Sequence, residues 1–277
     1  MRALKPTTEF SLSELCQLMN HFYEGYVVPV HLPVDAFAGM LRTDGVDLTQ
    51  SYVALEDEEP VAMGLIARRD KISRLAAFAV DIKLRGKGIG KWFLGELLDE
   101  AKDRKDREMV LEVITTNDSA VKLYERSGFA RKERLVGYGF SASAEEPMGD
   151  NSPIAGLHEA DMADLVAAIL ASGLEWPWQM SAETLAQMAW PNRAWQYESG
   201  YVCTSDLAKS VVLIRGLAGD ENDLAGLMTA LLKQFPGRSW RLLPVMPEGI
   251  YSGLFERLGF YTDKLSQWKM GVPFLSR

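Results

Sequence analysis

The chain has 277 residues, of which 47% are hydrophobic, and at about 150 residues per domain this length predicts two globular domains. Aspartate and glutamate number 38 against 30 lysines and arginines, so the formal net charge is -8 at pH 7. A nucleic-acid partner needs clustered positive charge, and this balance argues against one. The acidity is compatible with an amine substrate, and equally with a charge that serves only solubility.

Cysteine and histidine are rare. Cys16 and Cys203 lie far apart, and the three histidines do not cluster, so no metal-ligand spacing is present and we expect no metal cofactor. The N-terminal stretch lacks an apolar signal core, and no apolar run approaches the roughly 20 residues that cross a bilayer. We therefore expect a cytoplasmic protein without a membrane partner; the sequence does not predict its oligomeric state.

The first half alternates helix and strand patterns. In chain order, helical spacing or strand-length apolar runs predict a helix over 12–23, a strand pair over 51–55 and 60–68, a strand over 75–80, a helix over 91–104, a strand over 109–114 and a short helix over 119–126. Gly128 follows the last helix in the position of a glycine cap. This order predicts an α/β fold.

The second half resembles the first. LYERSGF at Leu123–Phe129 recurs as LFERLGF at Leu254–Phe260, and each copy follows an apolar strand-like run, over 109–114 and 240–245. A helical segment precedes each of these strands, over 91–104 and 223–235. The matching order favours a tandem duplication over a chance likeness of short helices. A small, polar stretch with two prolines separates the halves, so we predict domains over 1–140 and 154–277 with a linker over 141–153.

A glycine-rich turn lies between the predicted strand ending at Val80 and the following helix. Its sequence, RGKGIGK over Arg85–Lys91, lets successive backbone N–H groups line one concavity at a helix N-terminus, with basic side chains around it. This chemistry suits a pyrophosphate. The spacing GxGxG matches neither a Walker loop nor a dinucleotide fingerprint. A helix-capping turn with incidental charges is the alternative explanation.

Two motifs resemble those of the GCN5-related N-acetyltransferase (GNAT) superfamily. The family motif Q/R-x-x-G-x-G/A is matched by Arg85, Gly88 and Gly90, and a second family element, an Asn before a helix ending in LYxxxGF, is matched from Asn117 to Phe129. The resemblance implies two tandem domains, each with a mixed, splayed central sheet flanked by helices. It also implies acetyl-CoA as co-substrate, lying in the gap of the first sheet.

The cofactor-binding residues follow from this resemblance. Backbone groups of Phe78, Ala79 and Val80 would bind the pantetheine arm, and Asn117 would contact it from the far side. The pyrophosphate would lie against the turn, whose residues are Arg85, Gly86, Lys87, Gly88, Ile89, Gly90 and Lys91.

Direct attack by an amine on a thioester needs a base for the amine proton and an acid for the leaving thiolate. Tyr124 matches the family tyrosine near the coenzyme sulfur and is the candidate acid; the alternative is a packing aromatic. Glu112 interrupts an apolar strand and is the candidate base, at an offset from Tyr124 that some family members share. Glu112 ordering water or lining the cleft is the alternative, and Glu24 and Asp81 are reserve bases.

The segment after the first helix lines the acceptor site in this family. Phe22, Tyr23, Glu24 and Tyr26 are therefore candidate substrate-binding residues, unless this segment is only an aromatic lid.

The second half lacks the residues that the first half would use for cofactor binding and catalysis. Its corresponding turn, GLAGDEND over Gly216–Asp223, is acidic and would repel a pyrophosphate. Phe255 takes the place of the tyrosine, Leu243 that of Glu112 and Glu248 that of Asn117. We expect a degenerate copy that braces the first domain or shapes the acceptor cleft.

The whole pattern predicts an acetyl-CoA-dependent N-acetyltransferase acting on a primary amine, with a small molecule as the first candidate acceptor. The alternatives are acetylation of protein N-termini or lysines, and a non-catalytic acyl-CoA-binding sensor. Glu112 together with Tyr124 favours the enzyme, because a binding module needs neither.

Overall fold

The computed structural model describes residues 1–141 and 155–274, and the chain divides into two compact units. Unit 1 comprises Met1–Glu133 with Trp268–Arg277, and unit 2 comprises Arg134–Gln267. This division differs from the predicted boundaries, because the C-terminal segment belongs to unit 1 and unit 2 begins inside a strand. Apart from Ser141, the predicted linker lies outside the described residues.

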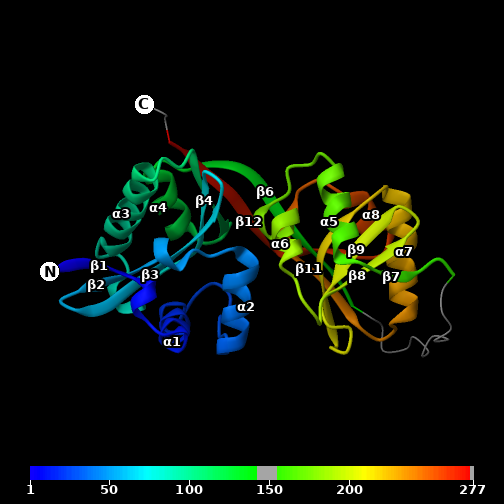
Figure 1. Ribbon diagram of the computed structural model, residues 1–277, viewed down its shortest axis with the longest axis horizontal. Coiled ribbons are helices and arrows are strands. Elements are labelled where there is room, and N and C mark those ends of the chain that lie inside the picture. Colours follow the sequence, from blue (N-terminus) through cyan, green and yellow to red (C-terminus); the bar gives the residue numbers. More distant parts are fainter. Residues whose placement is uncertain (142–154, 275–277) are drawn as a thin grey trace. The chain divides into compact units, whose positions relative to one another are not determined.

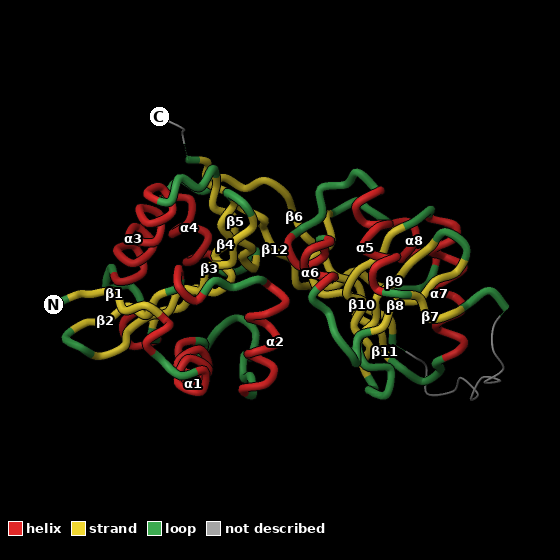
Figure 2. Tube along the Cα trace, in the orientation of Figure 1, coloured by secondary structure: helices red, strands yellow, loops and turns green. Residues whose placement is uncertain are grey.

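Unit 1 holds the elements of the first half (Figures 1 and 2). In chain order they are β1 (Arg2–Pro6), α1 (Leu12–Phe22), α2 (Val34–Asp44), β2 (Tyr52–Glu56), β3 (Glu59–Arg69), β4 (Ile72–Val80), α3 (Ile89–Asp103), β5 (Glu108–Ile114), α4 (Asp118–Arg126) and the start of β6 (Ala130–Phe140), with short 3₁₀ turns at Thr7–Glu9, Leu48–Gln50 and Ile82–Leu84. The predicted α/β elements are confirmed to within a few residues. The helix α2 and the strand β1 were not predicted.

The unit 1 sheet is mixed and covered on both faces. Its order is β1-β2-β3-β4-β5-β12, with antiparallel pairs through β4 and a parallel pair between β4 and β5. Side chains of α3 and α4 pack on one face of the sheet, and side chains of α1 and α2 pack on the other. Alternating strand residues supply both cores: in β3, Ala62 and Ile66 belong to the first, and Met63 and Leu65 to the second.

The two central strands part after a short contact. The register of β4 and β5 ends at Arg74↔Val110, although both strands continue beyond it. The β3–β4 register shifts at the same place: Leu65 pairs with Ala77 and Ile66 with Leu75, so Ala76 is an extra residue in β4. Such a bulge bends its strand and is common beside active sites. The bulge therefore accounts for the divergence of β4 from β5, which leaves the second half of β4 with an open edge.

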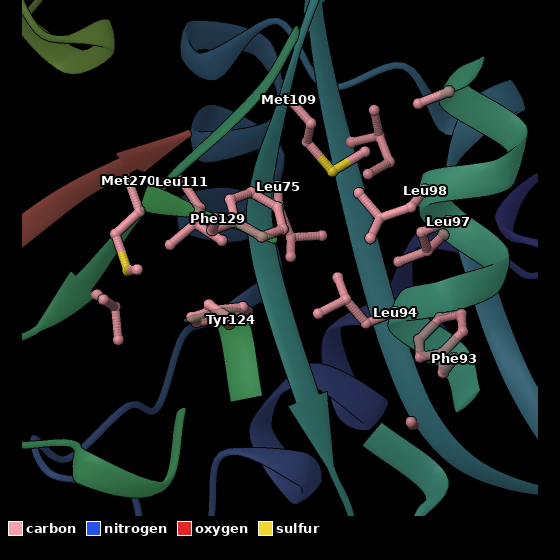
Figure 3. Close-up of a cluster of buried hydrophobic side chains, with 14 of the residues drawn as sticks. Leu75, Phe93, Leu94, Leu97, Leu98, Met109, Leu111, Tyr124, Phe129 and Met270 are labelled. Atoms are coloured by element: carbon pink, nitrogen blue, oxygen red, sulfur yellow. The ribbon is translucent and has the colours of Figure 1, made fainter. Parts of the chain in front are cut away.

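The C-terminal part of β12 (Tyr261–Pro273) completes the unit 1 core. Met270 is fully buried in the cluster that holds Tyr124 and Phe129, as Figure 3 shows. Trp268, Val272 and Phe274 pack against the same cluster. The backbone N–H of Phe274 also donates to the Arg107 carbonyl at 2.8 Å, just before β5. This core therefore needs residues from the far end of the chain.

Unit 2 repeats part of the element order of unit 1. Its elements are β7 (His158–Ala160), α5 (Met162–Ala171), α6 (Ala182–Ala186), β8 (Arg193–Tyr197), β9 (Gly200–Thr204), β10 (Val211–Ala218), α7 (Glu221–Gln234), β11 (Ser239–Pro247), α8 (Ser252–Arg257) and the start of β12, with a 3₁₀ turn at Trp178–Met180. The strand β10 runs parallel to β11 only from Val211↔Ser239 to Ile214↔Leu242, and β11 pairs with the Leu135–Phe140 part of β6. The succession β10-α7-β11-α8 therefore reproduces β4-α3-β5-α4.

Candidate active site

The glycine turn presents the start of α3. Gly86 and Gly88 adopt φ values of 79° and 86°, which side chains with a Cβ rarely tolerate. Gly88 caps α3 without any side-chain hydrogen bond, so the amides of the first helical turn keep no protein cap. Together with the positive end of the helix dipole, these amides form an anion site.

A cavity of about 340 Å³ lies against this turn, within the size range of small-molecule sites. Its lining residues are Phe22, Tyr26, Phe78, Ala79, Val80, Arg85, Gly86, Gly88, Gly90, Lys91, Asn117, Ser119, Ala120, Leu123 and Tyr124. A Cβ added at Gly90 would meet Leu123, Val80 and Phe78 at 3.5–3.9 Å, so a side chain there would fill the space that a ligand needs. The structure thus brings together most of the residues predicted to bind the cofactor.

Several predicted residues are absent from this lining. The side chain of Ile89 is buried in the hydrophobic core, which leaves only its backbone for a ligand. Lys87 is exposed outside the cavity, and its amide donates to the Leu84 carbonyl at 3.3 Å. Tyr23, Glu24 and Glu112 are also absent from the lining.

Arg85 makes a structural clamp. Its Nε donates to the Val80 carbonyl at 3.0 Å, and its Nη2 donates to the carbonyls of Phe22 and Glu24 at 2.8 and 3.2 Å. These bonds tie the end of α1 to the end of β4, so the guanidinium is largely committed before any ligand arrives. Among the described residues, Lys87 and Lys91 have no ion-pair partner, and they are the cations of the turn that a diphosphate can recruit.

Tyr124 is both a packing residue and a lining residue. Its ring meets those of Phe129 and Phe78 edge-on, with centroids 5.7 and 6.4 Å away. Burial raises the pKa of its hydroxyl, so the phenol keeps its proton throughout the neutral range. No hydrogen-bond partner for this hydroxyl is found in the described part of the chain, which leaves it able to donate into the cavity.

Glu112 lies in a buried ion-pair network that the sequence did not reveal. Arg74 donates from Nε to Glu112 at 2.7 Å and from Nη1 to Asp44 at 2.8 Å. The side chains of Arg74 and Glu112 are 6% and 4% exposed, so the pair is shielded from solvent. A carboxylate held by a buried guanidinium costs much to displace, which weighs against direct contact with a substrate.

The end of α1 gathers aromatic side chains at the site. Phe22 and Tyr26, two of the residues predicted to contact the acceptor, line the cavity. The Tyr26 hydroxyl bonds to the side chain of Asn117, and the Tyr26 ring lies edge-on to Tyr23 with centroids 5.0 Å apart. The Tyr23 hydroxyl accepts a hydrogen bond from the Phe78 amide at 3.3 Å.

His21 joins the two reserve carboxylates. Its Nε2 lies 2.9 Å from Asp81 Oδ2 and its Nδ1 lies 3.3 Å from Glu24 Oε1. The hydrogen bond to Asp81 is the main cause that raises the His21 pKa above its usual value of about 6.5. Because folded His21 binds its proton more tightly than the unfolded chain does, the protonated ring stabilises the fold below about pH 6.5. This stabilisation is lost as the pH rises through the folded-state pKa.

Replacing His21 with asparagine should therefore lower the free energy of unfolding in acid only. Because the ring is 44% exposed, we expect a loss of less than about 1 kcal/mol at pH 5.5 and almost none at pH 9. Urea denaturation of both proteins at the two pH values measures this difference. An equal loss at both would show that the charged imidazolium does not contribute.

Four residues of the site were not predicted from the sequence. Ser119, Ala120 and Leu123 line the cavity from α4, where a helix N-terminus after Asn117 was the available signal. Arg74 lies near the start of β4 and outside the predicted strand over 75–80, so only the fold reveals that it pairs with Glu112.

Unit 2 differs from unit 1 both at the turn before its helix α7 and at the position that corresponds to Tyr124. The helix α7 is capped by the Asp220 carboxylate, which accepts from the Asn222 amide at 2.8 Å, and its first turn carries Glu221 and Asp223. Phe255, in the position of Tyr124, is fully buried and stacked on Tyr138 with centroids 4.3 Å apart. A protein carboxylate thus already occupies the amides that a phosphate would need.

No helix within residues 1–141 or 155–274 is long and apolar enough to cross a membrane. In the same ranges, no group of three or more His, Cys, Asp or Glu side chains has the arrangement of a metal site.

Comparisons with known proteins find similar sequences and structures. Residues 13–129 match the model of the acetyltransferase (GNAT) family. N-alpha-acetyltransferase 30 of Schizosaccharomyces pombe is 33% identical over 95 residues, which cover 32% of this chain and 62% of that protein. The Xenopus laevis protein of the same name is 44% identical over 64 residues, 23% of each chain. The chain thus spans less than two thirds of the length of these relatives.

Solved structures of other proteins share the fold of the whole chain. A tandem GNAT protein from the clavulanic acid biosynthesis pathway superposes with a TM-score of 0.67 at 12% identity, covering 100% of this chain and 99% of that one. This likeness shows the fold and supports the two-domain architecture. Within this fold, residues 13–129 are the part of the chain that is similar to the acetyltransferase (GNAT) family.

Proposed function

We propose that this protein is an N-acetyltransferase that moves an acetyl group from acetyl-CoA to a primary amine, with one working site in unit 1. The observation that carries the proposal is the uncapped start of α3 opening onto a cavity that Tyr124 also lines. An anion site and a neutral phenol in one cavity suit a phosphate-bearing thioester.

The residues present fit the coenzyme. The amides of Gly86–Lys91, with Lys87 and Lys91, would hold the pyrophosphate. The open edge of β4 at Phe78–Val80 would hydrogen-bond the pantetheine arm, as a neighbouring strand would. Asn117, at the start of α4, faces the same cavity.

When bound, the coenzyme supplies the acetyl thioester. The amine nitrogen bonds to the carbonyl carbon while the carbon–sulfur bond breaks, and the nitrogen gives up a proton to a base. Tyr124, kept neutral by burial, would donate to the departing sulfur. Glu112 stays the proposed base, with Glu24 and Asp81 in reserve. Because Arg74 holds its carboxylate and it does not line the cavity, Glu112 would act on the amine through an ordered water.

Replacing Tyr124 with phenylalanine should lower kcat by about 100-fold, because the leaving thiolate loses its donor. The ring contacts remain, so the Kd for acetyl-CoA measured by calorimetry should change little. Thiol release measures the turnover. An unaltered kcat would remove Tyr124 from the mechanism.

The small-molecule amine predicted from the sequence is our first candidate acceptor. A second candidate is the α-amino group of a peptide, favoured because the matching relatives are named N-alpha-acetyltransferases. Thiol release from acetyl-CoA with a panel of small amines, aminoglycosides and peptides separates the two. Binding of acetyl-CoA without turnover of any acceptor would instead favour the non-catalytic sensor.

A further inference from the structure

One side of the helix α4 carries basic side chains beside the cavity. Ser119 and Leu123 line the cavity from this helix. Lys122 and Arg126 follow Ser119 at the spacing of successive helical turns, so these three residues lie along the same side of α4. The side chains of Lys122 and Arg126 are exposed. Ser119, Lys122 and Arg126 together are called the α4 edge below.

The α4 edge borders the turn at which α3 begins. A Cβ added at Gly90 would lie 3.5 Å from Cδ2 of Leu123, so the first turn of α3 abuts α4 at this residue. Lys91, the next residue of α3, lines the same cavity as Ser119. A pyrophosphate held by the amides of Gly86–Lys91 would therefore have the α4 edge beside it.

The positive charges of the α4 edge are not neutralised by the protein. Among the residues that the structure describes, neither Lys122 nor Arg126 has an ion-pair partner, although Asp118 lies about one turn before Lys122. Glu125, the other acidic residue of α4, is instead engaged by Arg131 at 2.8 Å. In a chain with a net charge of -8, these two cations are available to a bound anion.

Coenzyme A carries a second phosphate group that matches this feature. Besides the pyrophosphate, its ribose bears a phosphomonoester, a group with about two negative charges at neutral pH and several acceptor oxygens. The turn offers its amides, Lys87 and Lys91 to the pyrophosphate, so the monoester needs cations of its own close by. Lysine and arginine form strong charge-assisted hydrogen bonds with phosphate, and a guanidinium can bind two of its oxygens at once.

We propose that the α4 edge binds the 3′-phosphate of coenzyme A and makes the protein selective for the phosphorylated coenzyme. The inference rests on the proposed acetyl transfer and adds a binding site at the nucleotide end of the co-substrate, away from the reacting thioester. Lys122 and Arg126 would pair with the phosphate, and no covalent bond forms or breaks.

Acetyl-dephospho-CoA, which lacks only this phosphate, tests the inference beside acetyl-CoA. Calorimetry on the full chain should show that acetyl-CoA binds about 10- to 100-fold more tightly than acetyl-dephospho-CoA. In the double variant Lys122→Gln with Arg126→Gln, the affinity for acetyl-CoA should fall to about that for acetyl-dephospho-CoA, whose own affinity should change little. Both side chains are exposed, so their replacement leaves the fold intact.

The double variant Lys71→Gln with Lys105→Gln is the matched control. Both lysines are exposed and the same charge is lost, but they lie just before the start of β4 and just after the end of α3. The glycine turn joins the opposite ends of these two elements. The control should therefore leave both affinities unchanged.

Three results would overturn the inference: equal affinity of the wild type for the two ligands, an equal loss for both ligands in the α4 variant, or the same selective loss in the control. In each case a wild-type chain that binds acetyl-CoA and releases thiol leaves the proposed function standing. A wild-type chain that binds neither ligand would overturn both.

Discussion

Replacing Gly88 with glutamate is expected to weaken acetyl-CoA binding by at least about 100-fold. The residue caps α3 at φ 86°, so any side chain strains the turn, and a carboxylate there would compete for the amides that bind phosphate. Unit 2 shows the same arrangement naturally, with the Asp220 carboxylate capping α7. Calorimetric titration with acetyl-CoA measures the effect.

Gly45→Glu is the matched control. Gly45 also lies in unit 1 at a helix end, with φ 68° and open space where a Cβ would lie, and it does not line the cavity. The two variants share the strain and the added charge but differ in position. Equal affinity of Gly88→Glu and the wild type would refute the assignment of the turn.

Deleting residues 268–277 is expected to unfold unit 1. The deletion removes the buried Met270 and three apolar side chains that pack beside it, together with the hydrogen bond between Phe274 and Arg107. Their burial contributes on the order of 5 kcal/mol, which is comparable to the whole stability of a typical domain. Circular dichroism and thermal melting of the shortened chain measure the loss, and acetyl-CoA binding should disappear with the fold.

Point variants separate packing from chain length. Met270→Ala should cost about 2–5 kcal/mol, whereas Met270→Leu, which nearly conserves volume, should cost less than about 1.5 kcal/mol. A chain ending at Phe140 that melts cooperatively and binds acetyl-CoA would contradict this account. It would show that the first half folds without the C-terminal segment.

The elements of unit 1 were largely predictable because their signals are local. Apolar runs of strand length and helical spacing placed β4, α3, β5 and α4 to within a few residues. The strand β4 begins earlier than predicted, at Ile72, because polar Ser73 and Arg74 find buried partners that a local pattern cannot show. The assignment of Trp268–Arg277 to unit 1 depends on contacts between distant parts of the chain.

The features of the site likewise divide into those predictable from local sequence and those that depend on distant contacts. The position of the turn beside the cavity was predictable because a glycine-rich strand-to-helix turn has a recognisable sequence, and that of Asn117 because it precedes the LYxxxGF helix. The clamp made by Arg85, the ion pair of Glu112 with Arg74 and the bond between Tyr23 and Phe78 join residues far apart in sequence. No spacing rule reports such pairs. They decide which of the predicted side chains remain free to meet a ligand.

A crystal structure of the full chain with coenzyme A tests the central claim most directly. The account predicts the pyrophosphate against the amides of Gly86–Lys91, the pantetheine arm along β4 at Phe78–Val80, and the sulfur beside the Tyr124 hydroxyl. A coenzyme bound elsewhere in the chain, for example at the start of α7, would contradict it.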